Sequence, residues 1–382
     1  MIKKRFLMYS FIILLFAVMI SNDISYNEYF KSVEEINFSN KTKCKKLISK
    51  QPIEDFVKIN DDYLIGSSTT YLKLYYNYNY LNNKGENGTL ILLNLKNETL
   101  TEIPIENYPK KIHFNPEGIS LLNGNLLYII NHANTEGERI EIVNIEFNPI
   151  KLIHVKSIKL PNKFFGTLNS IAVIDKNTFY FTTSRIFGYP LHKNEITFLR
   201  NFFINYSGLF AKLLSMKLTN LYIYRNGKIN KIKGTEGILN NGLAYNKKEK
   251  ILFMAQTLEK TIKVYQIGKK ITDIALIKDI KSDYCIDNLD YDEKNNLLYA
   301  GILGKMHNIN IMAKNFFKKG NLGNEDVYGG LQVIDPDNDF KIINIYLLKN
   351  RLKAISSGSI INNKLIFSSV FDKGMLICER EK

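Results

Sequence analysis

The stretch that covers residues 117–130 reads EGISLLNGNLLYII, and it contains the unit on which the rest of the chain is built. A residue with a side-chain oxygen comes first, and the turn residues Asn123-Gly124-Asn125 then separate two short apolar runs. Apolar runs on either side of an Asn-Gly turn are typical of a β-hairpin. The stretch therefore predicts two antiparallel strands, with Glu117 near the start of the first.

The same unit occurs six times along the chain, about every 60 residues, and periods of this order mark the four-stranded blades of β-propellers. Helical periodicity is scarce after residue 50. The sequence thus predicts one all-β domain, a six-bladed β-propeller over residues 40–382. Two β-sandwiches are the alternative arrangement of six hairpins. The leading polar residues of the six units are Glu54, Glu117, Asn169, Asn241, the pair Asp287-Asn288, and Ser357.

The composition agrees with a large folded core and a basic surface. Of the 382 residues, 45% are hydrophobic and 12% aromatic, which excludes a disordered or collagen-like protein. Length alone allows two or three domains, and the sixfold unit reduces these to one. The formal net charge of +15 favours an anionic partner. Since no nucleic-acid-binding motif accompanies the basic residues, we expect an acidic membrane surface rather than nucleic acid.

The N-terminus has the pattern of an export signal. Lys3-Lys4-Arg5 precedes an apolar stretch from Phe6 to Ile20, and polar residues follow. A basic region before an apolar run of this length predicts a signal peptide or an uncleaved signal anchor over residues 1–24. We therefore expect an exported protein, either secreted or membrane-anchored and facing away from the cytoplasm. A buried N-terminal helix is the alternative.

Export changes the expected chemistry of the three cysteines. In an oxidising compartment Cys44 and Cys378 form the natural pair, because their disulfide would tie the two ends of the propeller together. Cys285 would then be a buried thiol. A fully reduced protein is the alternative.

The leading residues of five units, Glu54, Glu117, Asn169, Asn241 and the pair Asp287-Asn288, predict a metal site. The innermost strands of a propeller line its central channel, so residues at corresponding strand starts converge there. Carboxylate and amide oxygens suit a hard cation, and flexible, high coordination favours Ca²⁺ over Mg²⁺. Asn at a strand start is also a common turn former, which is the alternative interpretation.

Other chemical motifs are absent from the sequence, which has no G-x-S-x-G nucleophile elbow, no H-E-x-x-H zinc motif and no C-x-x-C. A cation with open positions can polarise a carbonyl group, but it needs a base nearby to activate water. His132 ends the second strand of the unit that begins with Glu117. The shared unit predicts that His132 belongs to the site, although a lone histidine is often only a structural hydrogen-bonding group.

With these residues in place, the sequence resembles the paraoxonase/arylesterase family of six-bladed calcium propellers, which hydrolyse lactones and aryl esters. The resemblance runs from about Cys44 to Cys378. It is carried by Cys44, Glu54-Asp55, Phe114-Asn115-Pro116-x-Gly118-Ile119-Ser120, Asn131-His132, Leu168-Asn169, Asn241-Gly242, Asp287-Asn288 and Cys378.

The resemblance implies two calcium sites and a catalytic pair. One ion, the catalytic calcium, would be bound by Glu54, Asn169, Asn241, Asp287 and Asn288. Asp55 and the backbone carbonyl of Ile119 would help hold a second, structural ion. Cys44–Cys378 would be the family's disulfide, and His132 would be the supporting member of its histidine dyad.

Two positions depart from the family pattern. Glu117 stands where the family has histidine, so it acts either as a replacement base or as a further calcium ligand. Ser170 stands where the family has an aspartate ligand of the structural calcium. We therefore expect that second site to be weakened or absent.

Residues 196–216 predict an amphipathic helix, and the family resemblance implies that it lies near the channel mouth. Their apolar side chains recur at helical spacing, and basic residues flank them. Such a helix would rest on an anionic membrane surface, together with the N-terminal apolar segment, or pack on the rim of the propeller.

The leading hypothesis is thus a calcium-dependent hydrolase of lactones or aryl esters, in which Glu117 and His132 activate water on a small-molecule substrate. A non-catalytic, envelope-associated calcium-binding propeller and a gluconolactonase-type sugar-lactone hydrolase are the alternatives.

Overall fold

The computed structural model describes residues 43–69, 87–133, 137–161, 167–185, 217–304, 312 and 327–380. The chain divides into two compact units, Met1–Lys41 and Thr42–Lys382, and every described residue belongs to the second. The predicted signal segment 1–24 and the predicted helix 196–216 lie outside the described residues. No helix within them is both long and apolar enough to cross a membrane.

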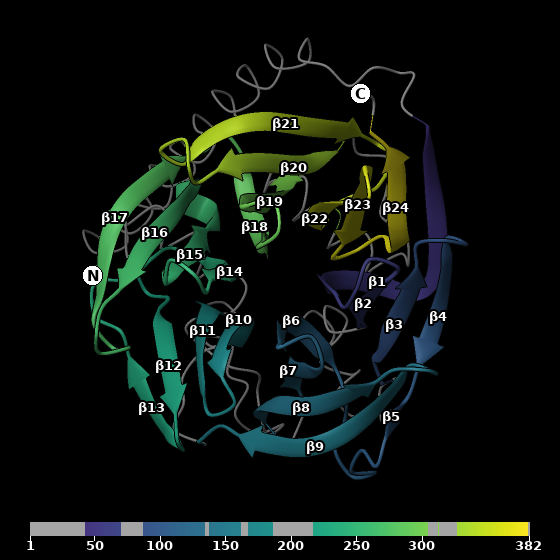
Figure 1. The fold of residues 1–382 in the computed structure, drawn as a ribbon, viewed down its shortest axis with the longest axis horizontal. Helices are drawn as coiled ribbons and strands as arrows, with labels where there is room; N and C mark the ends of the chain where they lie inside the picture. The colour runs from purple at the N-terminus through teal and green to yellow at the C-terminus, as the bar shows by residue number, and fades with distance from the viewer. Residues whose placement is uncertain are drawn as a thin grey trace, which may run out of the picture. The chain divides into compact units, whose positions relative to one another are not determined.

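The described residues form strands almost throughout, in an all-β propeller (Figure 1). Three sheets have four strands each, and a fifth strand, β5, pairs in parallel with the edge of a fourth sheet. The described residues also include one 3₁₀ turn, η3 (Thr257–Glu259). The three sheets are β10 (Thr167–Asp175), β11 (Thr178–Arg185), β12 (Leu221–Arg225), β13 (Lys228–Lys231); β14 (Asn240–Asn246), β15 (Ile251–Gln256), β16 (Thr261–Ile267), β17 (Ile274–Lys281); and β18 (Cys285–Asp292), β19 (Leu297–Gly304), β20 (Tyr328–Asp335), β21 (Lys341–Lys349). The fourth is β5 (Ile105–Glu106), β6 (Pro116–Leu122), β7 (Leu126–His132), β8 (Glu138–Glu146) and β9 (Lys151–Lys159).

The remaining sheet has seven strands, because one strand takes part in two four-stranded groups. Strand β1 (Cys44–Lys58) pairs with β24 (Lys373–Glu379) over Cys44–Pro52 and with β2 (Tyr63–Ser68) over Ile53–Lys58. The sequence predicts six separate blades, whereas the described residues form five sheets, since β1 continues from one group into the next. The sheet is completed by β3 (Thr89–Asn94), β4 (Thr99–Ile103), β22 (Ile355–Ile361) and β23 (Lys364–Ser369).

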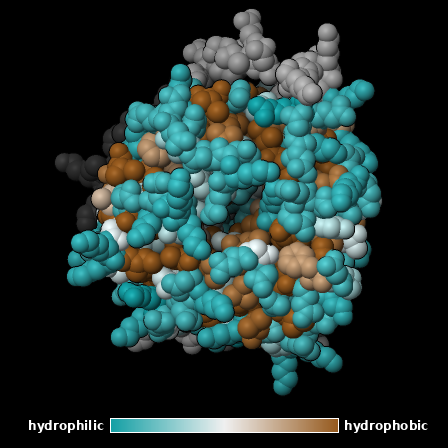
Figure 2. Space-filling model, viewed as in Figure 1, coloured by the Kyte–Doolittle hydropathy of each residue, from teal (hydrophilic) through white to brown (hydrophobic). Residues whose placement is uncertain are grey.

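The strands nearest the middle of the ring contact one another in succession. Strand β1 contacts β6, and contacts continue through β10, β14 and β18 to β22, which contacts β1 again. Figure 1 shows these strands around the centre, with the last strand of each group outside. Figure 2 shows hydrophilic residues over much of this face and a small hollow near the middle. The inner strands thus form a closed ring around the predicted site.

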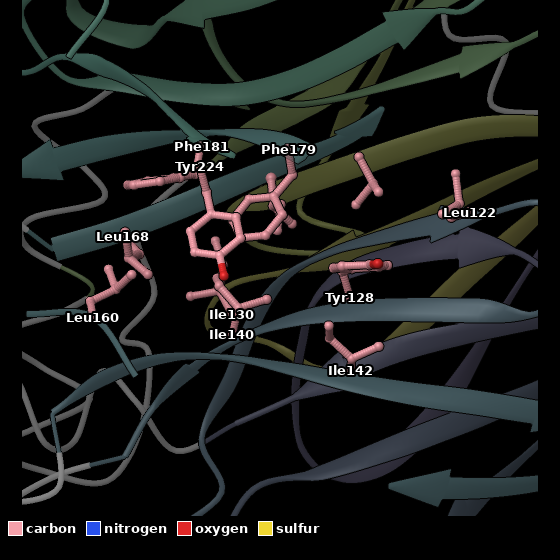
Figure 3. Packing of buried hydrophobic residues seen from close by; sticks show 12 residues of the cluster. Leu122, Tyr128, Ile130, Ile140, Ile142, Leu160, Leu168, Phe179, Phe181 and Tyr224 are labelled. Carbon is pink, nitrogen blue, oxygen red and sulfur yellow. The ribbon is translucent and has the colours of Figure 1, made fainter. Parts of the chain in front are cut away.

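Apolar side chains hold neighbouring sheets together. Between the sheets of β6–β9 and β10–β13, Tyr128 and Ile130 pack toward Phe179 and Phe181 (Figure 3). Phe179 also stacks on Tyr224, with 4.6 Å between ring centroids. Burying each such side chain stabilises the fold by about 1.5–3 kcal/mol relative to exposure. This packing explains why the strands carry apolar residues on both faces, as strands buried between other sheets do.

The predicted disulfide Cys44–Cys378 is confirmed. The two residues lie directly opposite each other in the β1–β24 pair, 334 residues apart in sequence. Cys285 is buried and takes no part in this bond. The disulfide therefore joins the first and last strands of the chain at the point where the ring closes.

We predict that reducing this disulfide lowers the free energy of unfolding by up to about 5 kcal/mol, because the unfolded chain loses the restraint of a very long loop. Urea unfolding of the wild type with and without reductant measures the change. The Cys285→Ala variant is the matched control and should show the same effect of reductant. A reductant effect that disappears with Cys285→Ala would contradict the assignment.

Candidate functional site

The predicted ligands lie on the inner strands, and a register irregularity accompanies each of them. Glu54 and Asp55 lie in β1, Asn169 in β10, and Asn241 in β14, while Asp287 and Asn288 lie in β18. The ladder of each of these strands shifts register at or directly beside the ligand position, and β6 does the same at Glu117. Bulges of this kind redirect side chains. They turn these residues out of the alternating pattern, and the residues are all buried.

Each asparagine donates its amide N–H to a carboxylate of another inner strand. Asn288 Nδ2 donates to Glu54 Oε1 at 2.9 Å, and Asn169 Nδ2 donates to Glu117 Oε1 at 3.2 Å. Asn241 Nδ2 donates to Asp287 Oδ1. These contacts join three pairs of inner strands. They also orient every amide with its nitrogen toward a carboxylate.

The opposite ends of these amides have no hydrogen-bond partner among the described residues. The Oδ1 atoms of Asn169, Asn241 and Asn288 are buried without a hydrogen bond in this part of the chain, and so is Glu54 Oε2. A buried oxygen without a partner costs about 1–3 kcal/mol, so native proteins rarely keep several together unless something else binds them. All four atoms are oxygens, which are the donors that calcium prefers. They belong to four of the five residues predicted to bind the catalytic calcium.

The carboxylates of the site repel one another. Burial raises the pKa of Glu54 well above its ordinary value, and the charges of Glu117, Asp55 and Asp287 raise it further. Burial likewise raises the pKa of Asp287 to about 8, against the opposing hydrogen bond from Asn241. A bound cation would stabilise the ionised forms.

These residues fit a calcium ion on the basis of their donor atoms. Within the described part of the chain, no three His, Cys, Asp or Glu side chains converge as a metal-binding group. A site here must therefore rely on amide oxygens as well as carboxylates, and this is the kind of donor set that the unpartnered oxygens supply.

The residues predicted for the second ion do not show the same fit. Asp55 Oδ1 accepts from the Phe56 N–H and the Ser357 hydroxyl at 2.9 Å, and Asp55 Oδ2 accepts from the Ile119 N–H at 3.1 Å. Ser170 Oγ accepts from the Leu243 N–H at 2.9 Å. Protein donors thus occupy the carboxylate that would bind a structural ion.

Glu117 and His132 are in direct contact. Glu117 Oε2 contacts His132 Nε2, and both groups are buried. On the other side of the imidazole, Nδ1 of His132 lies 2.9 Å from both carboxylate oxygens of Glu138. Burial lowers the pKa of His132, but Glu138 and Glu117 outweigh it and raise the pKa to about 10.

Sequence reasoning missed two contributions to the site. One is Glu138, which stands directly opposite His132 in the β7–β8 pair. A hairpin prediction that continued past His132 would have found it. The other comes from the last group of strands, where the hydroxyls of Ser356 and Ser357 on β22 and of Ser368 on β23 donate to the Glu54 carbonyl. These serines hold the backbone of Glu54 rather than a metal.

Comparison with known proteins identifies the family. Residues 78–378 match the sequence model of the arylesterase family, and the chain belongs to this family. No curated protein matches the chain by sequence. A solved structure assigned as a gluconolactonase has a TM-score of 0.52 and 12% identity, covering 90% of this chain and 93% of that one. A luciferin-regenerating enzyme also has a TM-score of 0.52, at 10% identity, covering 88% and 95%. At these identities the two structures are evidence of the shared fold alone, and family membership supports a hydrolase of the esterase or lactonase type.

We predict that Gly118→Ala and Gly242→Ala each destabilise the protein by about 3 kcal/mol or more, at the upper end of typical overpacking effects. An added Cβ would lie 2.3 Å from the Asn169 carbonyl oxygen in the first variant and 2.5 Å from that of Asp287 in the second. Backbone of a ligand strand would have to move, so calcium affinity should fall as well. Urea unfolding and calcium titration calorimetry measure both effects.

The control for these variants is Gly358→Ala, at the corresponding position of β22. There the added Cβ would meet side-chain carbons of Leu331 and Phe367 at 3.1 and 3.3 Å, which can shift. A loss of calcium affinity in this control as large as in Gly118→Ala would contradict the explanation.

We also predict that the calcium-free protein becomes less stable as pH rises from about 4 to 8. Asp287 keeps its proton in the folded state up to about pH 8, whereas its ordinary pKa is 3.8. Between these values the folded state binds more protons than the unfolded state, so stability falls with pH by up to about 1.4 kcal/mol per unit for each such proton. Calcium should remove this loss by binding the ionised carboxylates.

Urea unfolding at several pH values, with chelator or with calcium, tests the prediction. Asp287→Asn should flatten the pH dependence of the calcium-free protein. Stability that rises with pH in the presence of chelator would show that the carboxylates are not held as described.

Proposed function

We propose that this protein is a calcium-dependent hydrolase of lactones or aryl esters. The observation that carries the proposal is the group of four buried, unpartnered oxygens on Glu54, Asn169, Asn241 and Asn288. Membership of the arylesterase family supports the type of reaction. The proposal includes a six-bladed ring, in which β1 belongs to two neighbouring blades.

Calcium would be held by Glu54, Asn169, Asn241, Asp287 and Asn288. When bound, it supplies a Lewis acid that polarises a substrate carbonyl and stabilises the negative charge that develops on its oxygen. The second ion is not part of the proposal, because protein donors already satisfy Asp55. The amides keep their oxygens toward the ion, since their nitrogens are engaged by carboxylates.

Glu117 takes the role of general base toward a water molecule. Burial raises its pKa, and the charge and hydrogen bond of His132 oppose this rise. The balance keeps a carboxylate available in a buried site while raising its basicity above that of an exposed glutamate. Asn169 donates to the other oxygen of Glu117, so the group is held beside the proposed calcium ligands.

The proposal extends to location. The basic and apolar N-terminus supports export and either secretion or membrane anchoring. The amphipathic pattern of residues 196–216 and the net charge of +15 support association with an anionic membrane surface.

One observation favours a non-catalytic calcium-binding propeller as the second candidate. Both oxygens of Glu117 already take part in contacts, one with Asn169 and the other with His132. If these contacts persist when calcium binds, Glu117 would serve only to hold the inner strands together.

We predict that the protein hydrolyses members of a panel of aryl esters, aliphatic lactones and sugar lactones, and that complete chelation of calcium abolishes this activity. Initial rates before and after calcium is restored measure the effect. A preference for sugar lactones, with better activity on another divalent metal, would favour the gluconolactonase-type alternative. Calcium binding without turnover of any substrate would favour the non-catalytic candidate, and activity that survives chelation would refute the mechanism.

The variant Glu117→Gln separates the roles of this residue. A general base contributes about 10²–10⁴-fold to rate, so kcat should fall by that factor while calcium affinity stays close to that of the wild type. Calcium affinity that falls along with kcat would instead make Glu117 a calcium ligand.

A further inference from the structure

Three side chains of one sheet form a row that runs outward from the centre of the ring. Glu117 lies on β6, His132 on β7 and Glu138 on β8, and these strands are hydrogen-bonded neighbours. His132 and Glu138 are directly opposite in the antiparallel pair, which places their side chains on the same face. The register of the sheet therefore keeps the row together.

The hydrogen-bond donors and acceptors of these three side chains determine where the protons of the row lie. An ionised carboxylate only accepts hydrogen bonds, and a neutral imidazole has a single N–H. His132 faces a carboxylate at each ring nitrogen, Glu117 at Nε2 and Glu138 at Nδ1. Both contacts are satisfied when the imidazole carries a proton on each nitrogen. The raised pKa of His132 agrees with that state.

The two carboxylates differ in their surroundings. The Glu117 side chain is 5% exposed and that of His132 is 1% exposed, whereas Glu138 is 12% exposed at the outer end of the row. Glu138 binds Nδ1 with both oxygens at 2.9 Å. It therefore fixes the orientation of the imidazole from the side away from the calcium ligands.

We propose that Glu138 is a positioning residue of the hydrolytic centre, which holds His132 so that its Nε2–H is directed at Glu117. This inference rests on the proposed function, in which Glu117 is the base. Glu138 acts through His132 and touches neither the water nor the substrate. With Glu138 in place, the Glu117 carboxylate is oriented by two donors, His132 and Asn169.

Replacing Glu138 by Gln preserves its shape but removes the charge that supports the doubly protonated imidazole. The Nε2–H directed at Glu117 is then no longer enforced, because the single proton of a neutral imidazole can lie on Nδ1 and donate to the Gln oxygen. In that state Nε2 is an acceptor facing an acceptor, and Glu117 loses its orientation. We predict that kcat of Glu138→Gln for an aryl ester such as phenyl acetate falls at least 10-fold. KM and the calcium dissociation constant should stay within about twofold of the wild type. Glu138→Asp keeps the charge and should recover part of the lost kcat.

Glu146→Gln is the matched control, because Glu146 is an exposed residue at the other end of β8. Its kcat should equal that of the wild type. An unchanged kcat in Glu138→Gln, or a kcat that falls in step with calcium affinity and thermal stability, would overturn the positioning role.

Nitrogen-15 NMR of the calcium-loaded protein at neutral pH provides a readout that does not depend on turnover. Both ring nitrogens of His132 should carry protons in the wild type and in Glu146→Gln, and one should lose its proton in Glu138→Gln. A wild-type His132 with a single N–H would refute the inference even if the enzyme is active. A wild type that hydrolyses no ester or lactone would refute the proposed function, and the NMR result would still decide whether Glu138 controls His132.

Discussion

The architecture depends on one strand that belongs to two groups of strands. The first part of β1 pairs with β24, where Cys44 and Cys378 are joined, and its second part begins the inner ring and carries Glu54. The serines of the last group donate to the Glu54 carbonyl, so closure of the ring also places the residue that we propose as a calcium ligand. A chain that failed to close would leave Glu54 without its neighbours.

Burying several carboxylates together is unfavourable unless something neutralises them. Among the described residues around Glu54 and Asp287, amide N–H groups donate hydrogen bonds to these carboxylates and stabilise them in part. The oxygens of the same amides are left without hydrogen-bond partners there. In the proposed function, these oxygens are placed in advance for a cation, and burying them without partners destabilises the metal-free fold. At the neighbouring Asp55, protein N–H and O–H groups already supply the hydrogen bonds. Glu54 and Asp55 are thus adjacent in sequence, but protein donors satisfy Asp55, whereas one oxygen of Glu54 has no partner among the described residues.

At position 117 the family resemblance leads us to expect histidine, and the glutamate found there is supported by neighbouring side chains. A second carboxylate, Glu138, faces the opposite nitrogen of His132, so that one cationic imidazole lies between two acids. This arrangement differs from a pair of histidines in charge and in the number of protons it holds. It gives the buried Glu117 a hydrogen-bonding partner of opposite charge.

The sequence by itself determined the strand-rich class, the position of each hairpin's leading residue, and the partners of the disulfide. The class and the hairpin positions follow from local patterns, since apolar runs and turn residues act within a few positions. The pairing of Cys44 with Cys378 follows instead from the expected export and from their places at the two ends of the domain. Side chains with carboxylate or amide oxygens recur at one place in five of the six units, and together with the family resemblance this predicted the members of the proposed calcium site, from Glu54 to Asn288. The tertiary structure alone decided that β1 is shared between groups, that each amide faces a particular carboxylate, and that Glu138 stands beside His132. The Asn288–Glu54 contact joins residues on the inner strands of different sheet groups. Such pairings depend on how whole sheets pack against each other, and no local preference of the chain encodes that packing.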